Sequence, residues 1–201
     1  MEILTLLMLL AVAAYLLKSR EQNKRIALLG SYLGKHQIEK LMETLTAGYT
    51  RALGEADPVR QTQIWNLLQT TELALSEQFN RFAADFSGVN EEDARVSKLG
   101  LLIPYAGKLF PQATFDMRKA VAIHAQGIGR AVTGSPAQTA KSRGFDLSAE
   151  LFLMQHTCHW FCRSKTVASA RMLARHKTTY AQLVAAVVPD TRQAYRVLTA
   201  L

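Results

Sequence analysis

Residues 3–17 read ILTLLMLLAVAAYLL, an apolar run without a charge, a glycine or a proline. As an α-helix this run is about 22 Å long, because each residue adds about 1.5 Å, whereas the hydrocarbon core of a bilayer is about 30 Å thick. Lys18 and Arg20 follow the run, and such long side chains can reach the headgroups from just inside the membrane. The run therefore predicts a single membrane span of minimal length at residues 1–17.

Three interpretations of this run compete. A cleavable signal peptide has its basic residues before the apolar run; here they follow it, although the small residues 11–14 imitate a cleavage site. A buried core helix at the N-terminus is the second interpretation. We favour the third, an uncleaved signal-anchor. The positive-inside rule then leaves the N-terminus outside and the chain from Lys18 onward in the cytoplasm, at the inner or plasma membrane.

After a basic juxtamembrane segment at 18–27, the sequence predicts one helical domain over residues 28–201. Two long amphipathic helices are expected in 28–88, because apolar residues recur there at spacings of three and four. Asp57 and Pro58 are typical of a helix start, an N-cap followed by a first-turn proline. Two such helices joined by a short turn predict an antiparallel αα-hairpin. The apolar positions are Ile38, Met42, Leu45, Tyr49 and Ala52, then Ile64, Leu68, Thr71, Leu75, Phe79, Phe82 and Phe86.

Residues 90–134 predict short helices and an apolar loop. The loop at 99–110, LGLLIPYAGKLF, is broken by Pro104 and Gly107. We expect it to be a buried loop or a short core helix. The alternative is a loop that dips into the membrane beside the anchor, since exposed apolar patches mark interaction surfaces.

The final third predicts a flexible break followed by a basic helical part. Residues 135–145, SPAQTAKSRGF, are small and polar, which favours a flexible connection. In 146–201 we expect a long helix through Arg175 that is capped by Asp146 or Ser148. Capping-box spacings follow at Thr179–Gln182 and Asp190–Gln193. Because no alternating β-branched pattern of useful length occurs, the predicted fold class is all-α.

Composition limits the class of protein. The 201 residues are 49% apolar and 20% charged, which excludes a wholly disordered or collagen-like chain, and two cysteines cannot build a disulfide scaffold. The formal net charge is +8 and it is unevenly spread: residues 26–114 carry a net −2 and residues 115–201 a net +8. A basic C-terminal part indicates an anionic partner, which can be lipid, nucleic acid or an acidic protein.

The densest reactive cluster lies in QHTCHWFCR, which holds His156, Cys158, His159 and Cys162. Cysteine and histidine are ligands of zinc and copper, so these four residues are the candidate metal or thiol site. The spacing between the cysteines is not that of a zinc knuckle, and no second ligand pair follows. We therefore favour buried structural cysteines in an apolar helix, and predict no cofactor.

Five basic residues form the candidate surface for an anionic partner. They are Arg163, Lys165, Arg171, Arg175 and Lys177. A solvated basic face is the ordinary interpretation; anionic lipid is a functional one, and nucleic acid is a further one that we do not favour, because the helix after Lys177 offers few side chains for reading bases.

The sequence contains no recognisable catalytic constellation, so we expect no catalytic residues and lean against an enzyme. The predicted function is a membrane-anchored helical binding protein, an adaptor, scaffold or assembly factor at the cytoplasmic membrane face. Its predicted partners are the lipid bilayer and either a protein or a second copy of the chain. Two alternatives stay open: a thiol- or metal-dependent protein using the cluster at 156–162, and binding of nucleic acid or anionic lipid by the basic C-terminal part.

Overall fold

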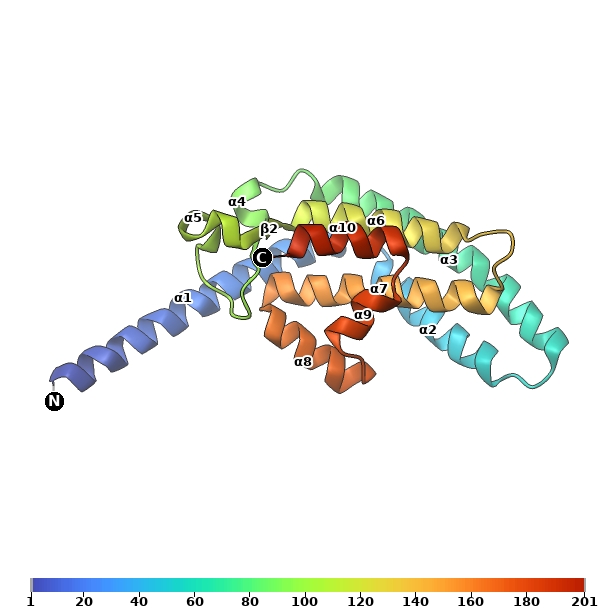
Figure 1. Cartoon of the computed structure of the whole chain (residues 1–201), viewed down its shortest axis with the longest axis horizontal. Helices are drawn as coiled ribbons and strands as arrows, with labels where there is room; N and C mark the ends of the chain where they lie inside the picture. The colour runs from blue at the N-terminus through green and yellow to red at the C-terminus, as the bar shows by residue number, and fades with distance from the viewer. Residues whose placement is uncertain (1, 201) are drawn as a thin grey trace.

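The structure is a computed structural model that describes residues 2–200, so the outermost residues of the expected anchor and domain, Met1 and Leu201, lie outside it. The described chain is almost entirely helical, which confirms the all-α class (Figure 1). The helices are α1 (Glu2–Leu33), α2 (Ile38–Gly54), α3 (Pro58–Phe86), α4 (Glu91–Ala94), α5 (Ala106–Leu109), α6 (Met117–Thr133), α7 (Ala140–Cys162), α8 (Lys165–His176), α9 (Tyr180–Ala186) and α10 (Pro189–Thr199), with a 3-10 turn at Pro111–Ala113.

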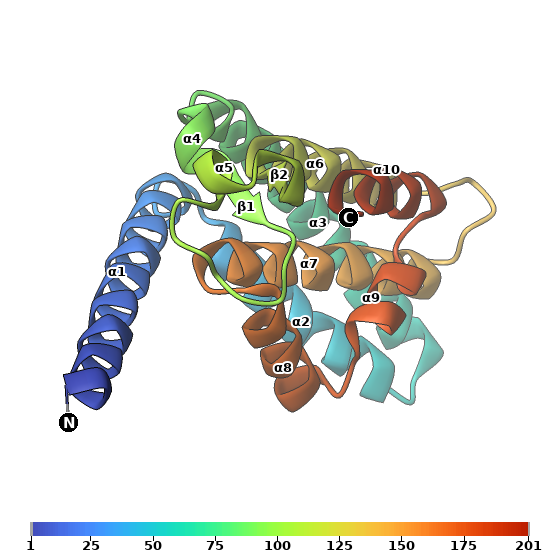
Figure 2. The same ribbon diagram turned by 60° about the vertical axis from the view of Figure 1, so that its left-hand side comes forward.

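Helix α1 has two unlike halves. Every residue from 2 to 18 is exposed, and this half projects away from the rest of the molecule (Figures 1 and 2). The second half packs against α7 and α3 and buries Arg25 and Leu29. The helical hairpin was expected to begin at residue 28. The structure differs, because α1 continues to Leu33 and residues 28–33 belong to it. One uninterrupted helix therefore connects the apolar segment to the core of the domain.

Helices α2 and α3 pack against each other after the chain reverses at residues 55–57. The side chain of Asp57 accepts a hydrogen bond from the amide of Val59 at 2.9 Å, and Pro58 occupies the first turn, so the predicted start of α3 is confirmed. The rings of Tyr49 and Trp65 lie 5.4 Å apart across the pair. The phenylalanines of α3 then extend this contact into the main core.

Helix α7 is the central helix of the domain and contacts α1, α2, α3, α6, α8 and α9 (Figure 2). It begins at Ala140, where the Thr139 side chain caps it by accepting a hydrogen bond from Ser142 N at 3.1 Å. The expected break at 135–145 is therefore helical from 140 onward, and the cap is neither Asp146 nor Ser148. The long helix expected through residue 175 is also interrupted, because Ser164 leaves helical geometry and caps a separate helix, α8.

The C-terminal helices close the domain on the side of α6. The capping box of Thr179 and Gln182 at the start of α9 is confirmed. The second expected box is wrong: α10 begins two residues earlier than that box implies, with Val188 at the N-cap position and Pro189 in the first turn.

A two-stranded antiparallel ribbon, β1 (Arg95–Ser97) with β2 (Thr114–Asp116), is the one sheet of the described chain, and the sequence did not predict it. Strands of three residues are too short to show an alternating pattern. The ribbon matters for the site because it joins the two ends of the segment 98–113, which lies next to α1 (Figure 2).

Candidate functional site

The point where α1 enters the domain is organised around a buried arginine. The Arg25 guanidinium donates to the backbone carbonyl of Arg95 at 2.9 Å and to that of Phe161 at 3.3 Å. Its Nε donates to the Glu21 carboxylate at 2.8 Å, and its charge lies 5.4 Å from the centre of the Phe161 ring. A buried arginine is stable only when its donors are occupied in this way. Arg25 therefore fastens α1 to β1 and to the end of α7.

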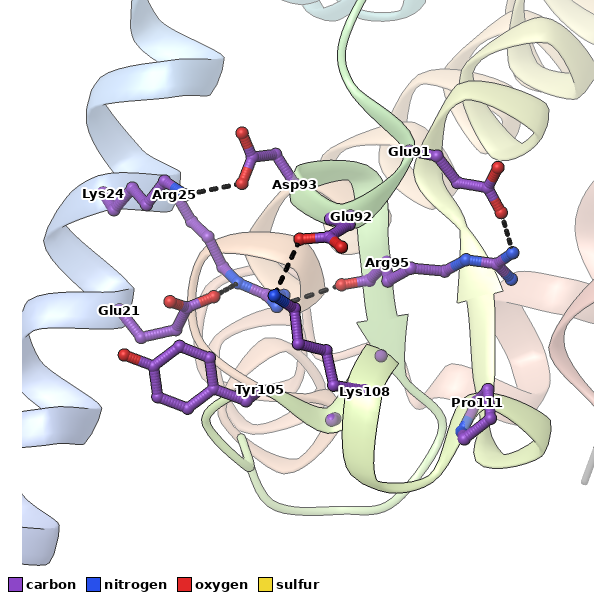
Figure 3. A pocket seen from close by; sticks show the side chains of 12 residues that line it. Glu21, Lys24, Arg25, Glu91, Glu92, Asp93, Arg95, Tyr105, Lys108 and Pro111 are labelled. Atoms are coloured by element: carbon purple, nitrogen blue, oxygen red, sulfur yellow. Dashed lines mark hydrogen bonds and ion pairs between the residues drawn. The ribbon is translucent and has the colours of Figure 1, made fainter.

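A cleft of about 380 Å³ lies beside this arginine, between α1 and the segment from α4 to Pro111 (Figure 3). Charged side chains of both signs line it, and most of them neutralise each other. Lys24 pairs with Asp93 at 2.5 Å, Lys108 pairs with Glu92 at 3.1 Å, and Arg95 pairs with Glu91. The hydrogen bond from Lys24 to Asp93 raises the pKa of the lysine, which keeps it charged. The pairs join α4 to α1, to α5 and to β1, and we call these three ion pairs the charged clasp.

A second, mainly apolar groove of about 260 Å³ lies where α1, α2 and α7 meet. Its walls include two methionines, Met42 and Met154, and the candidate residues Cys158, His159 and Cys162. Methionine side chains are flexible and adapt to apolar partners of different shape. Such a groove is suited to an apolar side chain of a partner.

The four residues of the candidate metal site do not converge. Cys158, His159 and Cys162 line the groove, whereas His156 lies on another face of α7, with its Nε2 3.1 Å from the Ser169 hydroxyl and its ring against Tyr180. Within residues 2–200, no group of three or more histidine, cysteine or acidic side chains is placed to hold a metal ion. Residues two apart on a helix point about 200° apart, which explains why His156 is separated from Cys158.

The two cysteines are reduced, and their surroundings favour the neutral thiol. Burial raises the pKa of Cys158 far above its ordinary value and that of Cys162 to about 11. The thiolate is the reactive and metal-binding form of cysteine, so both groups are unreactive near neutral pH. The Cys158 thiol instead contacts the Met154 sulfur at 3.7 Å, as a structural cysteine does.

The five basic residues divide between structural contacts and the surface. Arg163 donates to the side chain of Gln22 on α1 at 2.6 Å. The Lys165 ammonium lies 5.0 Å from the Trp160 ring and 4.7 Å from the Tyr180 ring, where burial lowers its pKa.

Arg171 and Arg175 lie one turn apart on α8, and Arg171 approaches His159 Nδ1 at 3.3 Å. Lys177 ends α8 with a left-handed backbone. Only some of the five basic residues of the candidate surface are thus free to contact an anionic partner.

A buried polar network in the core could not be recognised from the sequence. The Thr157 hydroxyl lies 2.9 Å from both His124 Nε2 and the Tyr195 hydroxyl, which joins α6, α7 and α10. Burial lowers the pKa of His124 to about 3, so this histidine is neutral. The three residues are separated by more than thirty positions and form no local motif. The sequence indicated the network only through polar residues at positions where their helices are otherwise apolar.

Glu150 is a second buried polar group that has no recognisable signature in the sequence. Its Oε1 accepts a hydrogen bond from the amide of Val188 at 3.1 Å, and burial raises its pKa to about 7. A Cβ atom on Gly127 would lie 2.3 Å from the other carboxyl oxygen, so a glycine is required there for the carboxyl to fit between α6 and α7. The carboxyl is fully buried, and it links α7 to the start of α10.

Comparisons of the chain with protein-family models, with curated proteins and with solved structures found no match. The functional argument therefore depends on the geometry described above.

Proposed function

We propose that this chain is a membrane-anchored helical binding protein, an adaptor, scaffold or assembly factor whose domain lies at the cytoplasmic face of the inner or plasma membrane. The proposal depends on one observation: the first half of α1 is long and apolar enough to cross a membrane and none of its hydrophobic window is buried by the rest of the chain. Large apolar side chains exposed in a continuous array are costly in water, at about 25 cal/mol per Å². A bilayer supplies the missing cover.

The orientation follows from charge. Lys18, Arg20 and Lys24 follow the apolar run, and all three are exposed on α1. Basic residues within about 15–20 positions of a span favour the cytoplasmic side. The domain would then lie in a reducing compartment, which is compatible with two free thiols.

The charged cleft and the apolar groove favour binding over catalysis. The charged cleft is largely occupied by ion pairs within the chain, and both thiols beside the apolar groove are held neutral by burial. The apolar groove offers adaptable methionines, which suits a helix or loop of a protein partner or of a second copy.

Carbonate extraction of the full-length chain, carrying a C-terminal reporter that is active only in the cytoplasm, tests the anchor and its orientation together. We expect the wild type in the carbonate-resistant membrane fraction with an active reporter. The matched variant Leu7→Lys/Leu10→Lys should be released to the soluble fraction, since each lysine near the middle of a span costs about 3 kcal/mol of insertion free energy. Recovery of the wild type in the soluble fraction would contradict the anchor, and an inactive reporter on membrane-bound protein would contradict the orientation.

Site-specific photocrosslinking from native membranes tests the groove. A photoreactive residue at Met42, inside the groove, should give a discrete crosslinked product, whereas the same residue at the exposed position Leu67 on α3 should not. Equal crosslinking at both positions would show that the groove is not the binding surface.

A further inference from the structure

The segment 99–110 exposes an unusual share of the apolar surface of the domain. Of the thirteen large apolar side chains that are exposed after α1 in the described chain, five lie in these twelve residues. They are Leu99, Leu101, Tyr105, Leu109 and Phe110, of which Leu101 is 66% exposed and Leu109 62%. The expectation of a buried loop is therefore only partly correct, because these five side chains lie at the surface.

The segment is nevertheless held firmly by the domain. Leu102 and Ala106 are buried and anchor it from within. The carbonyl of Gly100 accepts hydrogen bonds from the amide and the hydroxyl of Thr166 on α8, at 3.3 and 2.8 Å. At its base, Lys98 N donates to the carbonyl of Ala113 at 2.8 Å. The outward apolar side chains are thus presented by an ordered support.

Tyr105 has a backbone conformation that a tyrosine adopts at a cost. Its φ is 58°, in the left-handed region, where a non-glycine residue loses about 1–2 kcal/mol. Tyr105 lies directly before the short helix α5, and the residue is 55% exposed. Tyrosine is enriched at membrane interfaces, where its ring lies among the headgroups and its hydroxyl stays wet.

The segment lies at the level of the expected membrane surface. Tyr105 and Glu21 line the same cleft, and the Tyr105 ring lies beside α1 near Glu21 (Figure 3). Glu21 is four residues beyond Leu17, the end of the apolar run, which is about 6 Å along a helix. The headgroup layer on each side of the hydrocarbon is about 5–7 Å thick. Tyr105 would therefore lie within that layer if α1 spans the bilayer.

The views of the whole chain agree with this placement. The segment that leads from β1 to α5, and α5 itself, lie on the side of the domain from which the first half of α1 projects (Figures 1 and 2). The turn between α2 and α3 lies at the opposite end (Figure 1). The segment 99–110 and the exposed half of α1 therefore lie on the same side of the domain.

We propose that residues 99–110 form a second membrane contact, an interfacial loop that inserts Leu101, Tyr105, Leu109 and Phe110 into the headgroup and upper acyl region of the leaflet that α1 crosses. This inference rests on the proposed anchoring by α1. A bilayer is favoured over a protein partner because the loop is continuous with the surface that α1 defines. Because Arg25 fastens α1 to the domain, two contacts fix the orientation of the domain on the membrane.

An environment-sensitive NBD label tests the loop in the full-length protein, reconstituted in vesicles of phosphatidylcholine and phosphatidylglycerol. The label is attached at Leu101→Cys, with Cys158 and Cys162 replaced by serine and the thermal midpoint checked for each variant. Leu67→Cys, on the half of α3 near the opposite end of the domain, is the aqueous control (Figure 1). Leu10→Cys in α1 is the hydrocarbon control.

We expect the label at position 101 to emit at shorter wavelength than at position 67, and to be quenched at least twofold more strongly by shallow lipid nitroxides. Replacing Leu109 and Phe110 by glutamate should return the label at 101 to an aqueous spectrum without unfolding the domain. If the label at 10 lies in lipid while the label at 101 behaves like that at 67, the interfacial loop is wrong and the anchor stands. If the labels at 10 and 101 are both aqueous, the anchoring and the loop fail together.

Discussion

The first half of α1 and the middle of α7 are both apolar helical segments, and they differ in what covers them. No residue of α7 between Leu147 and Cys162 is exposed, whereas every residue of α1 from 2 to 18 is. Six neighbouring helices surround α7, and its Thr157 and His156 side chains have hydrogen-bond partners on α6 and α8. An apolar helix without a polar face is stable only inside a cover. For α7 the cover is protein, and for α1 we propose that it is lipid.

The largest expected effect comes from placing the same charge in each segment. Leu153→Lys, at a fully buried position of α7, should destabilise the domain by more than about 4 kcal/mol, because the ammonium has no partner in the core. Leu10→Lys in α1 should leave the thermal midpoint in detergent unchanged and weaken membrane insertion alone. Thermal unfolding in detergent, monitored by circular dichroism, measures the stability of both variants. Equal destabilisation would mean that the first half of α1 packs on protein.

The next effect concerns the joint between the two environments. Arg25→Met should destabilise the domain by about 3–5 kcal/mol, since it leaves the Glu21 carboxylate and two backbone carbonyls without their donor. Arg25→Lys should recover only part of this loss, because an ammonium cannot reproduce the guanidinium fork. Chemical denaturation in detergent measures the change. A loss below 1 kcal/mol for Arg25→Met would show that α1 is not fastened at this point.

A smaller effect is the pH dependence of stability that the buried Glu150 carboxyl of α7 causes. Burial raises the pKa of Glu150 from 4.5 to about 7, and Asp146 adds to the increase while Arg130 opposes it. Between these pH values the unfolded chain loses the proton and the folded chain retains it, so stability falls as the pH rises. The carboxyl contributes a loss of about 3 kcal/mol between pH 4.5 and 7.

Glu150→Gln keeps an oxygen that can accept from Val188 N and removes the titration. We expect this variant to be more stable than the wild type above pH 7 and to have a flatter stability profile between pH 4.5 and 7. Urea unfolding at several pH values measures the profile. A variant whose stability follows the same pH slope as the wild type would exclude Glu150 as the titrating group.

The smallest loss of stability is expected for the exposed ion pair between Lys24 and Asp93. Lys24 is adjacent to Arg25 in sequence, but its side chain is 58% exposed where it pairs with Asp93. Exposed ion pairs contribute about 0.2–1 kcal/mol, so Lys24→Ala should cost less than 1 kcal/mol, and less still at high salt. Denaturation at low and high salt tests this, and a loss as large as that of Arg25→Met would remove the distinction between the two residues.

Features that depend on neighbouring residues could be predicted from the sequence. The apolar run of α1, the start of α3 at Asp57–Pro58 and the capping box at Thr179 all have local signals that the structure confirms. The start of α7 at Ala140 was missed because small and polar residues suggested a break, although Thr139 was available as a cap. The interruption at Ser164 has neither glycine nor proline to mark it.

The site was harder to predict because its residues come from distant parts of the chain. Arg25 was expected to contribute to a basic juxtamembrane segment, and its buried contacts with the carbonyls of Arg95 and Phe161 have no sequence signature. Of the four candidate metal ligands, Cys158, His159 and Cys162 line one groove, and His156 points away from them because residues two apart on a helix lie on different faces. The charged clasp of α1, α4 and α5 also depends on the β1–β2 ribbon, which is too short to be detected.

The central claim is that one continuous helix passes from lipid into the core of the domain. Spin labels placed singly at positions 6 to 30 of the full-length protein in vesicles, with accessibility to oxygen and to a water-soluble nickel complex measured at each, test this directly. We predict high oxygen and low nickel accessibility at positions 6–14, a crossover near Lys18, and low accessibility to both reagents at the buried position Leu29. High nickel accessibility throughout positions 6–14 would contradict the account.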